Sequence, residues 1–217
     1  MSDLDEPTAP RRGAVDPTVA ADLPGLRLDW LEITVPPGST SARSRSRSSL
    51  VERLRMLSDR YRGATVVAMR THPIPRAYRT FYRQIGLDPD VDRIPSERAA
   101  MERLLQGGFQ PTDMITDACV VAVIETGVPV WALDAAAVDP APPGLGIGLA
   151  HEPDAPPGSL VVRDRRTVHA PLFGTPLPGH EPGPSAATIV LYALGVAGVP
   201  QIHIDEALWL AADLLGS

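Results

Sequence analysis

The stretch TDACVVAVIETGVPVWALD, residues Thr116 to Asp134, carries the clearest fold signal in this chain. Its first part has apolar residues at helical spacing, and Gly127 follows as a stop signal that tolerates the left-handed conformation found at many helix ends. The same part is rich in β-branched residues, which are stiff at χ1 and would suit a buried strand equally well. The final residues, from Pro129 to Asp134, are predicted to form a strand.

The motifs in and around this stretch resemble a known editing domain. In the B3/B4 domain of the phenylalanyl-tRNA synthetase β subunit, a helix ending Glu-x-Gly-x-Pro leads into a strand that reads x-x-Ala-x-Asp. The matching residues here are Glu125, Gly127, Pro129, Ala132 and Asp134. Stand-alone B3/4-domain proteins look more similar still, because they also have an Arg-Ala-Tyr-Arg-like helix and a Pro-Ser-Glu turn, present here at residues 76–79 and 95–97. The resemblance covers about residues 70–217 and favours a helix before the strand.

This resemblance implies a pocket between the helix–strand segment and the later strands. In the synthetase, that pocket hydrolyses a wrongly attached tyrosine from its tRNA. The family positions fall here on Cys119 in place of a threonine, on an unchanged Pro129, on Trp131 in place of a histidine and on Tyr192 in place of a glutamate. Strand alternation puts Pro129 and Trp131 on one face, so we expect them to form the floor. Two aromatic side chains in place of a polar pair favour stacking on a ring or an apolar group.

Hydrolysis would need groups that orient water and stabilise an oxyanion. His169 lies in a predicted strand that the resemblance places beside the pocket, and it suits water activation, although a histidine bonded within the sheet is the alternative. Asp117 on a nearly apolar helix is costly to bury unpaired, so it either lines the pocket or pairs with Arg76 or Arg79. Backbone donors around Gly174 are expected to assist. The predicted catalytic residues are therefore His169 and Asp117.

The remaining pocket residues are assigned to substrate binding rather than to chemistry. Cys119 on an apolar helix face has no base or positive neighbour in the sequence, so a packed thiol is favoured over a nucleophile. The substrate-binding candidates are Cys119, Pro129, Trp131, Gly174 and Tyr192.

Basic residues are distributed unevenly along the chain. All 20 are arginines, and the formal net charge is −6. Residues 41–83 contain 11 arginines against two acidic residues, whereas residues 101–217 contain four against 13. The basic stretch could lie along the phosphates of tRNA, or it could be a solvated helix surface. The RNA-binding candidates are Arg43, Arg45, Arg47, Arg53, Arg55 and Arg62.

The rest of the pattern predicts an α+β fold with helices packed around a mostly antiparallel sheet. Residues 1–24 are expected to be a mobile N-terminal tail and residues 25–217 a single B3/4-like domain. Strands are expected over residues 26–35, 65–69, 146–151, 160–164, 167–172 and 187–194. Helices are expected around Leu50, Leu54 and Leu57, over about 75–85, and behind N-caps at Ser96 and Asp205. Residues 174–185 read GTPLPGHEPGPS and predict a long surface loop.

Composition narrows the class of protein further. One cysteine cannot form an internal disulfide, which agrees with a reducing compartment. The histidines and the cysteine show no metal-ligand spacing, so neither a metal nor a cofactor is expected. No apolar run approaches the roughly 20 residues of a membrane helix, and the N-terminus is polar, so we expect a cytoplasmic protein without a membrane partner.

Two functions remain open at this level. The leading interpretation is a trans-editing-like deacylase that recognises an aminoacyl group on tRNA. The alternative is a non-catalytic binding module, or a biosynthetic tailoring protein, for a small aromatic or modified amino acid. The substituted histidine and glutamate favour the second, and the arginine-rich stretch favours the first.

Overall fold

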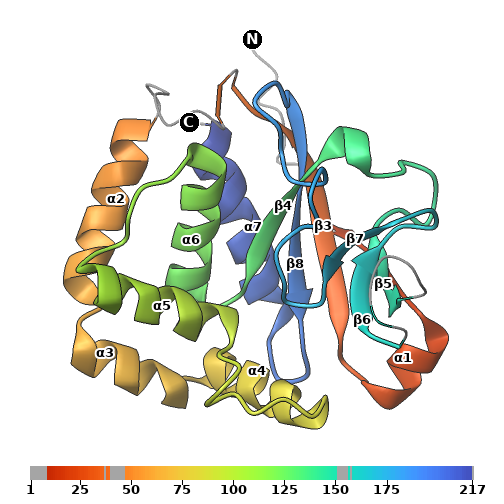
Figure 1. Cartoon of the computed structure of the whole chain (residues 1–217), viewed down its shortest axis with the longest axis horizontal. Helices are drawn as coiled ribbons and strands as arrows, with labels where there is room; N and C mark the ends of the chain where they lie inside the picture. Colours follow the sequence, from red (N-terminus) through yellow and green to blue (C-terminus); the bar gives the residue numbers. More distant parts are fainter. Residues whose placement is uncertain (1–8, 37, 40–46, 151–155, 157, 217) are drawn as a thin grey trace.

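The structure is a computed structural model that describes residues 9–36, 38–39, 47–150, 156 and 158–216. Along most of the chain, helices and strands fall into separate runs, in the α+β arrangement that the sequence predicts (Figure 1). The α-helices of the described residues are α1 (Pro17–Asp22), α2 (Arg47–Arg60), α3 (Gly63–Ala68), α4 (Pro73–Gln84), α5 (Pro95–Gln106), α6 (Met114–Thr126) and α7 (Gln201–Gly216), with 3-10 turns η1 (Met69–Thr71) and η2 (Ala135–Ala137). The strands are β1 (Arg11–Arg12), β2 (Ala14–Val15), β3 (Arg27–Thr34), β4 (Val130–Asp134), β5 (Gly146–Leu149), β6 (Leu160–Arg163), β7 (Val168–Pro171) and β8 (Thr188–Gly195).

The strands of the described residues form two four-stranded sheets, where the sequence predicts one. The first has the order β1-β3-β8-β4 and is antiparallel throughout. The second has the order β2-β5-β6-β7, in which β2 and β5 run parallel and the other pairs are antiparallel. Every residue of β8 after Thr188 is buried, as expected for a strand that has neighbours on both sides and a layer over each face.

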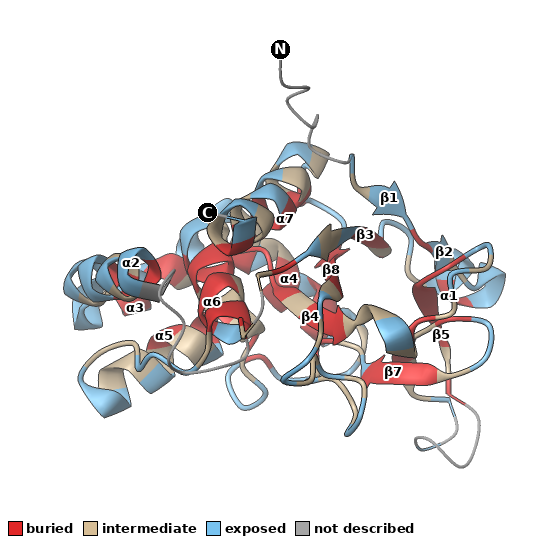
Figure 2. Ribbon diagram, turned by 90° about the horizontal axis from the view of Figure 1, so that it is seen from above, coloured by how far each residue is buried: buried red, intermediate tan, exposed pale blue. Residues whose placement is uncertain are grey.

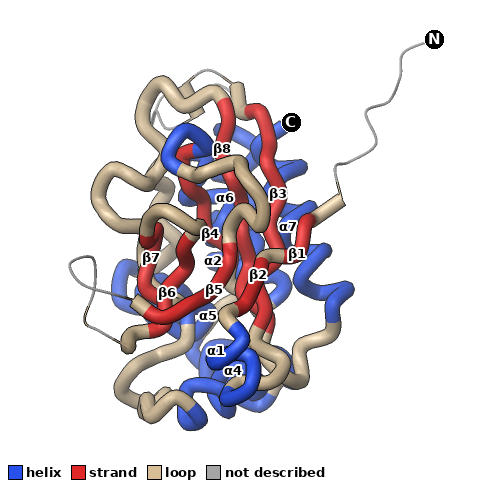
Figure 3. The backbone as a smooth tube through the Cα atoms, turned by 90° about the vertical axis from the view of Figure 1, so that its right-hand side faces the viewer, coloured by secondary structure: helices blue, strands red, loops and turns tan. Residues whose placement is uncertain are grey.

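These elements are layered. Helices α6 and α7 cover one face of the first sheet, and the second sheet lies at its opposite face (Figures 1 and 3). Helices α2, α3 and α5 lie beyond α6, away from the first sheet. Helix α4 packs against the end of that sheet, where the hydroxyl of Tyr78 donates to the carbonyl of Leu194 on β8 at 2.6 Å. Buried residues concentrate on α6 and on the strands beside it (Figure 2). The helix–strand unit α6–β4 is therefore the centre of the molecule rather than part of its surface.

The helix α6 and the strand β4 confirm the prediction made from residues 116–134. Asp113 starts the helix, because its carboxylate accepts from the N–H groups of Ile115 and Thr116, each at 3.0 Å. Gly127 ends it with a φ of 77°, and its N–H donates to the carbonyl of Val123. A helix that is apolar on nearly every face is buried on nearly every face, which explains why its periodicity is weak.

Three local predictions are wrong. Residues 65–69 form α3 and η1 instead of a strand, and Val66 and Met69, three residues apart, face the core. Ser96 does not cap α5, because Ile94 is at the N-cap and Pro95 is the first helical residue. Asp205 does not cap α7 either, since that helix begins four residues earlier, at Gln201.

Residues 1–8 of the predicted mobile tail lie outside the described residues, and the part that follows them is ordered. Residues 11–22 form β1, β2 and α1, and the first two pair with β3 and β5. Asp16 caps α1 by accepting from the N–H of Thr18 at 2.9 Å. Strands of two residues have no period to detect, so only their distant partners reveal them.

Candidate functional site

A cavity of about 240 Å³ opens between α5, α6, β4 and the segment that follows β7. Four of the residues predicted to bind substrate line it together, namely Cys119, Pro129, Trp131 and Gly174. The fifth, Tyr192, is buried and does not line the cavity. The structure therefore gathers around one space the positions that the helix–strand motif pointed to.

The floor of the cavity is a fixed aromatic surface. Trp131 on β4 and Tyr192 on β8 are cross-strand partners, and their rings stack with centroids 5.4 Å apart and planes at 17°. Phe173 lies 6.3 Å from the Trp131 ring. Phe173 also contacts the rings of Tyr78, Phe81 and Tyr82 on α4, at 5.9, 5.7 and 5.4 Å. Trp131 is thus held in place by Tyr192 and Phe173, and the part of its half-buried side chain that they leave uncovered lines the cavity.

The turn after β7 forms the opposite wall and is tightly built. Phe173 has a φ of 59°, an uncommon left-handed conformation for a bulky residue. Such residues persist only where the surroundings hold them, and they cluster at functional sites. The N–H of Gly174 donates to the carbonyl of Pro171 at 2.9 Å. Among the backbone donors predicted around Gly174, its own N–H is therefore engaged within the turn.

Cys119 contributes a neutral thiol to the cavity wall. Burial, with a smaller contribution from the nearby Asp113, raises the pKa of the thiol to about 12. A thiol with this pKa is protonated at neutral pH and is a poor nucleophile. Its place among the apolar side chains of Val120 and Val123 agrees with the packed thiol favoured by the sequence.

The rim carries two charges that sequence reasoning missed. Arg98 and Glu102 lie four residues apart on α5, and both line the cavity. Within the part of the chain that the structure describes, no ion pair involves either side chain, and Arg98 donates only to the carbonyl of Arg93, at 3.3 Å. A positive and a negative group therefore stand at the mouth of an apolar cavity. The spacing of four residues indicates that Arg98 and Glu102 share one face of a helix, but only the fold shows that this face borders the cavity.

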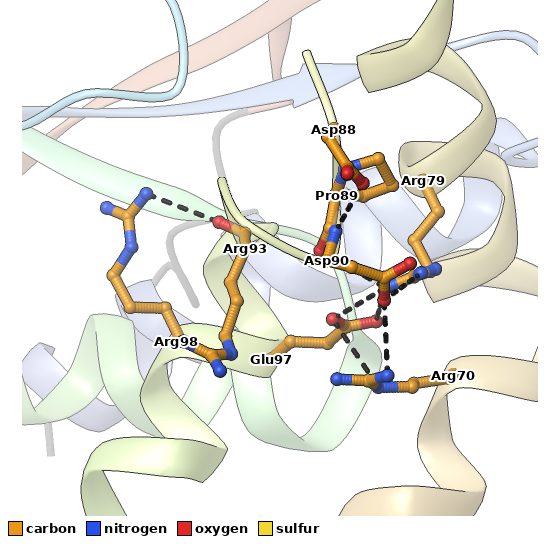
Figure 4. Close-up of polar contacts among 8 residues, drawn as sticks. All are labelled: Arg70, Arg79, Asp88, Pro89, Asp90, Arg93, Glu97 and Arg98. Carbon is orange, nitrogen blue, oxygen red and sulfur yellow. Dashed lines mark hydrogen bonds and ion pairs between the residues drawn. The ribbon is translucent and has the colours of Figure 1, made fainter.

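An ion-pair cluster built on the buried pair of Arg79 and Glu97 joins α5, which carries these two charges, to α4 (Figure 4). Nη1 of Arg79 donates to both carboxylate oxygens of Glu97, at 2.9 and 3.1 Å, and its Nη2 donates to Asp90 at 2.7 Å. Arg70 reaches Asp90 from the other side at 3.2 Å. Arg98 points away from this cluster. The two motifs at residues 76–79 and 95–97 thus meet through Arg79 and Glu97.

Asp117 has a different partner from the one predicted. Arg79 is occupied by Glu97 and Asp90, and Arg76 is exposed on α4. The buried carboxylate of Asp117 accepts from the N–H of Thr112 at 2.8 Å. Asp117 thus stabilises the segment that leads into α6. It is not one of the described residues that line the cavity.

His169 is also away from the cavity. It is fully buried on β7, where its Nε2 bonds Oδ2 of Asp164 at 3.0 Å and its Nδ1 bonds Nδ1 of His180 at 2.8 Å. Burial lowers the pKa of His169, and Asp164 only partly offsets this. Burial alone would raise the pKa of Asp164, but N–H groups of Asp139, Arg166 and Thr167, together with His169, bring it below its ordinary value. Both ring nitrogens of His169 are engaged, as expected of a histidine bonded within the sheet.

Four of the six predicted RNA-binding arginines lie in the part of the chain that the structure describes, on α2 or directly after it. Arg43 and Arg45 fall outside the described residues, and Arg47 begins α2. On α2, Arg53 makes two bonds to Glu125, at 2.8 and 2.6 Å. Arg55 and Arg62 form longer pairs at 3.6 and 3.5 Å with acidic residues three positions earlier. Exposed pairs of this kind contribute little to stability, so they do not prevent a contact with phosphate.

Comparison of the chain with protein-family models and with curated proteins finds no match. Within the described ranges, no group of three or more histidine, cysteine or acidic side chains could hold a metal ion. In the same part of the chain, no helix combines the length and apolar character needed to cross a membrane.

Proposed function

We propose that this protein binds an amino-acid-like ligand, with an aromatic or apolar side chain, in the cavity above Trp131. The observation that carries the proposal is an aromatic floor, stacked on Tyr192, beside two charges on α5 that have no ion pair in the described structure. A ligand side chain would stack on the Trp131 ring. Its carboxylate would bind Arg98, and its amino group would bind Glu102, through charge-assisted hydrogen bonds.

The resemblance to the B3/B4 editing domain supports the same ligand class. That family recognises aminoacyl groups, and the positions carried over from it, Cys119, Pro129, Trp131 and Tyr192, cluster in or directly behind one cavity. We therefore also propose that the domain is B3/B4-like. The cavity of about 240 Å³ suits a ligand smaller than the drug-sized molecules that occupy pockets of about 300–1,000 Å³.

Binding without hydrolysis accounts best for the side chains at hand. Among the described residues that line the cavity, the ionisable ones are Arg98, Glu102 and Cys119. Arginine stays protonated, and the thiol is neutral, so Glu102 is the one side chain there that could accept a proton from water. The predicted catalytic residues His169 and Asp117 have partners elsewhere.

A second candidate function, deacylation of an aminoacyl-tRNA, is favoured by one observation, the arginine-rich surface of α2. Arg55 and Arg60 are exposed there, and residues 41–83 carry 11 arginines. In this case tRNA phosphates would contact that surface while the aminoacyl group entered the cavity. Glu102, rather than His169 or Asp117, would then orient the water.

Isothermal titration with a panel of L-amino acids and their amides tests the first function. We expect binding of aromatic or branched apolar members, loss of detectable binding in Trp131→Ala, and no change in Trp209→Ala, a control on the exposed face of α7. Arg98→Gln should weaken binding of free amino acids about tenfold, the loss of one charge-assisted bond, but leave the amides nearly unchanged. Binding that survives Trp131→Ala, or no binding by any panel member, would reject the proposal.

Release of amino acid from a panel of mischarged tRNAs tests the second function. Deacylation above the buffer rate that Glu102→Gln lowers by about 10²-fold or more would support it. Affinity for tRNA should also fall as salt rises, and Arg55→Gln should reduce the slope of log affinity against log salt by about one. If no tRNA in the panel releases its amino acid, the deacylation function is rejected and only the binding function remains.

A further inference from the structure

Three side chains outside the cavity form an unusual hydrogen-bonded chain. Asp164 follows β6, His169 lies on β7, and His180 lies in the segment of residues 172–187 that connects β7 to β8. The two bonds measure 3.0 Å between Asp164 and His169 and 2.8 Å between the histidines. Asp164 and His169 are buried, at 4% and 0% exposure, while His180 is half-buried. The binding function proposed above does not involve these three side chains.

The hydrogen-bond acceptors determine which ring nitrogens of His169 and His180 carry a hydrogen. Three backbone N–H groups and His169 surround the carboxylate of Asp164, which can only accept while it is ionised. His169 must therefore carry a hydrogen on Nε2, and its Nδ1 is then an acceptor when the ring is neutral. His180 must donate from its own Nδ1. The contact survives one added proton on His180, but it breaks when both rings are protonated, because two N–H donors then face each other.

The segment held by this contact also builds the cavity. Its residues Phe173, Gly174 and Thr175 line the wall opposite α6. Residues 174–185 contain four prolines and three glycines and form no helix or strand. Among the described residues, the His180–His169 bond is the only side-chain hydrogen bond between this segment and the second sheet. The backbone of the segment also bonds the rest of the described protein at five points. These bonds join Leu172 to Leu160, Gly174 to Pro171, Leu177 to His169, His180 to Asp134 and Ala187 to Val35.

We propose that His169 and His180 form a proton-operated latch that fixes the β7–β8 segment, and with it one wall of the cavity, and that opens on acidification. The proposal rests on the binding function where it concerns ligand affinity. The latch is closed while the two rings carry at most one added proton between them. Opening leaves the segment held by its backbone bonds and by the ring contacts of Phe173 alone, so the cavity wall beside Trp131 becomes more mobile.

The charged groups around the pair agree with opening at acidic pH. Asp164 faces His169, and Arg165 and Arg166 near it are paired with Asp139. Glu181 accepts the backbone N–H of His180, and the N–H of Asp134 donates to the carbonyl of His180. Burial lowers the pKa of His169 below its ordinary value of 6.5. The folded state therefore binds fewer protons than the unfolded chain, and the latch weakens as pH falls below about 6.5.

Hydrogen exchange of the backbone amides of residues 172–187, measured at pH 7.5 and 5.0 and corrected for intrinsic rates, tests the latch without any ligand. We expect at least tenfold faster exchange at pH 5.0 in the unmodified protein. His180→Phe, which cannot make the bond, should exchange fast at both pH values. The control His203→Gln, a half-exposed histidine paired with Glu206 on α7, should behave like the unmodified protein. Equal exchange at both pH values in the unmodified protein, or protection that persists in His180→Phe, would overturn the latch.

Titration of ligand at the same two pH values separates the latch from the binding function. The dissociation constant should rise at least tenfold from pH 7.5 to 5.0 in the unmodified protein and in His203→Gln, and should be raised and nearly constant in His180→Phe. An affinity that does not change with pH while the segment opens would overturn its role as a cavity wall. If no ligand binds at any pH but exchange follows the pattern above, the latch stands and the binding function fails.

Discussion

The buried ion pair between α4 and α5 allows one substitution to be predicted in magnitude. In Glu97→Gln, Arg79 keeps its charge but loses the buried carboxylate that it contacts at 2.9 and 3.1 Å. Asp90 remains at 2.7 Å, but its side chain is 56% exposed, so water weakens this attraction. Removing one partner of a buried pair costs about 3–5 kcal/mol. Because Asp90 stays in place, we expect the lower end, about 3 kcal/mol.

Urea unfolding followed by circular dichroism measures this loss. For a chain of this size an m-value near 3 kcal/mol/M turns a loss of about 3 kcal/mol into a midpoint lower by about 1 M. The matched control is Asp59→Asn, whose pair with Arg62 is exposed at both ends and should contribute less than about 0.5 kcal/mol. Adding Arg79→Met to Glu97→Gln should recover about 1–2 kcal/mol relative to the sum of the single losses. A Glu97→Gln midpoint equal to that of Asp59→Asn would refute the view that this pair fixes α5 on α4.

Three further outcomes follow from single residues. Native Cys119 should react with iodoacetamide at pH 8 on the order of 10³-fold more slowly than a free thiol, because burial raises its pKa from 9.0 to about 12. Unfolding in urea should restore the rate of a free thiol. A fast reaction of the native protein would contradict the burial. Asp164→Asn should be less stable than the unmodified protein at pH 7. The difference in melting temperature between the two should shrink below about pH 4, because a carboxylate with a lowered pKa stabilises the fold only while it is ionised. An undiminished difference at pH 3 would argue against this role of the Asp164 carboxylate. Gly146→Ala would press a Cβ against the carbonyl oxygen of Ala14 and should cost about 1–3 kcal/mol, a drop of several degrees on thermal unfolding. Gly63→Ala, in open space, should cost almost nothing.

Local sequence determined the helices and strands whose signals are contiguous. The cap at Asp113, the apolar run and the stop at Gly127 lie within fifteen residues, so α6 and the start of β4 were predictable. The leucines of α2 repeat at helical spacing, and Leu50, Leu54 and Leu57 are all buried. The resemblance to the B3/B4 domain implied that Cys119, Pro129 and Trp131 share a pocket, and these three residues of the unit line one cavity.

Only the tertiary structure decided which distant side chains meet. The sequence shows Arg79, Glu97 and Asp117 as charges that need partners. The packing of α4 on α5 selects Glu97 for Arg79, and Asp117 accepts from the N–H of Thr112. His169 carries no local sign of a bond to His180, eleven residues away in a proline-rich segment.

The two-residue strands and the rim charges follow the same rule. A strand as short as β1 has no period, so it exists only because β3 offers it hydrogen bonds. Arg98 and Glu102 gain a common role only because α5 is placed against α6 and β4. Backbone propensity and apolar period act between near neighbours and can be recognised along the chain. Hydrogen bonds, ion pairs and cavity walls depend on distances in space, which the folded chain alone sets.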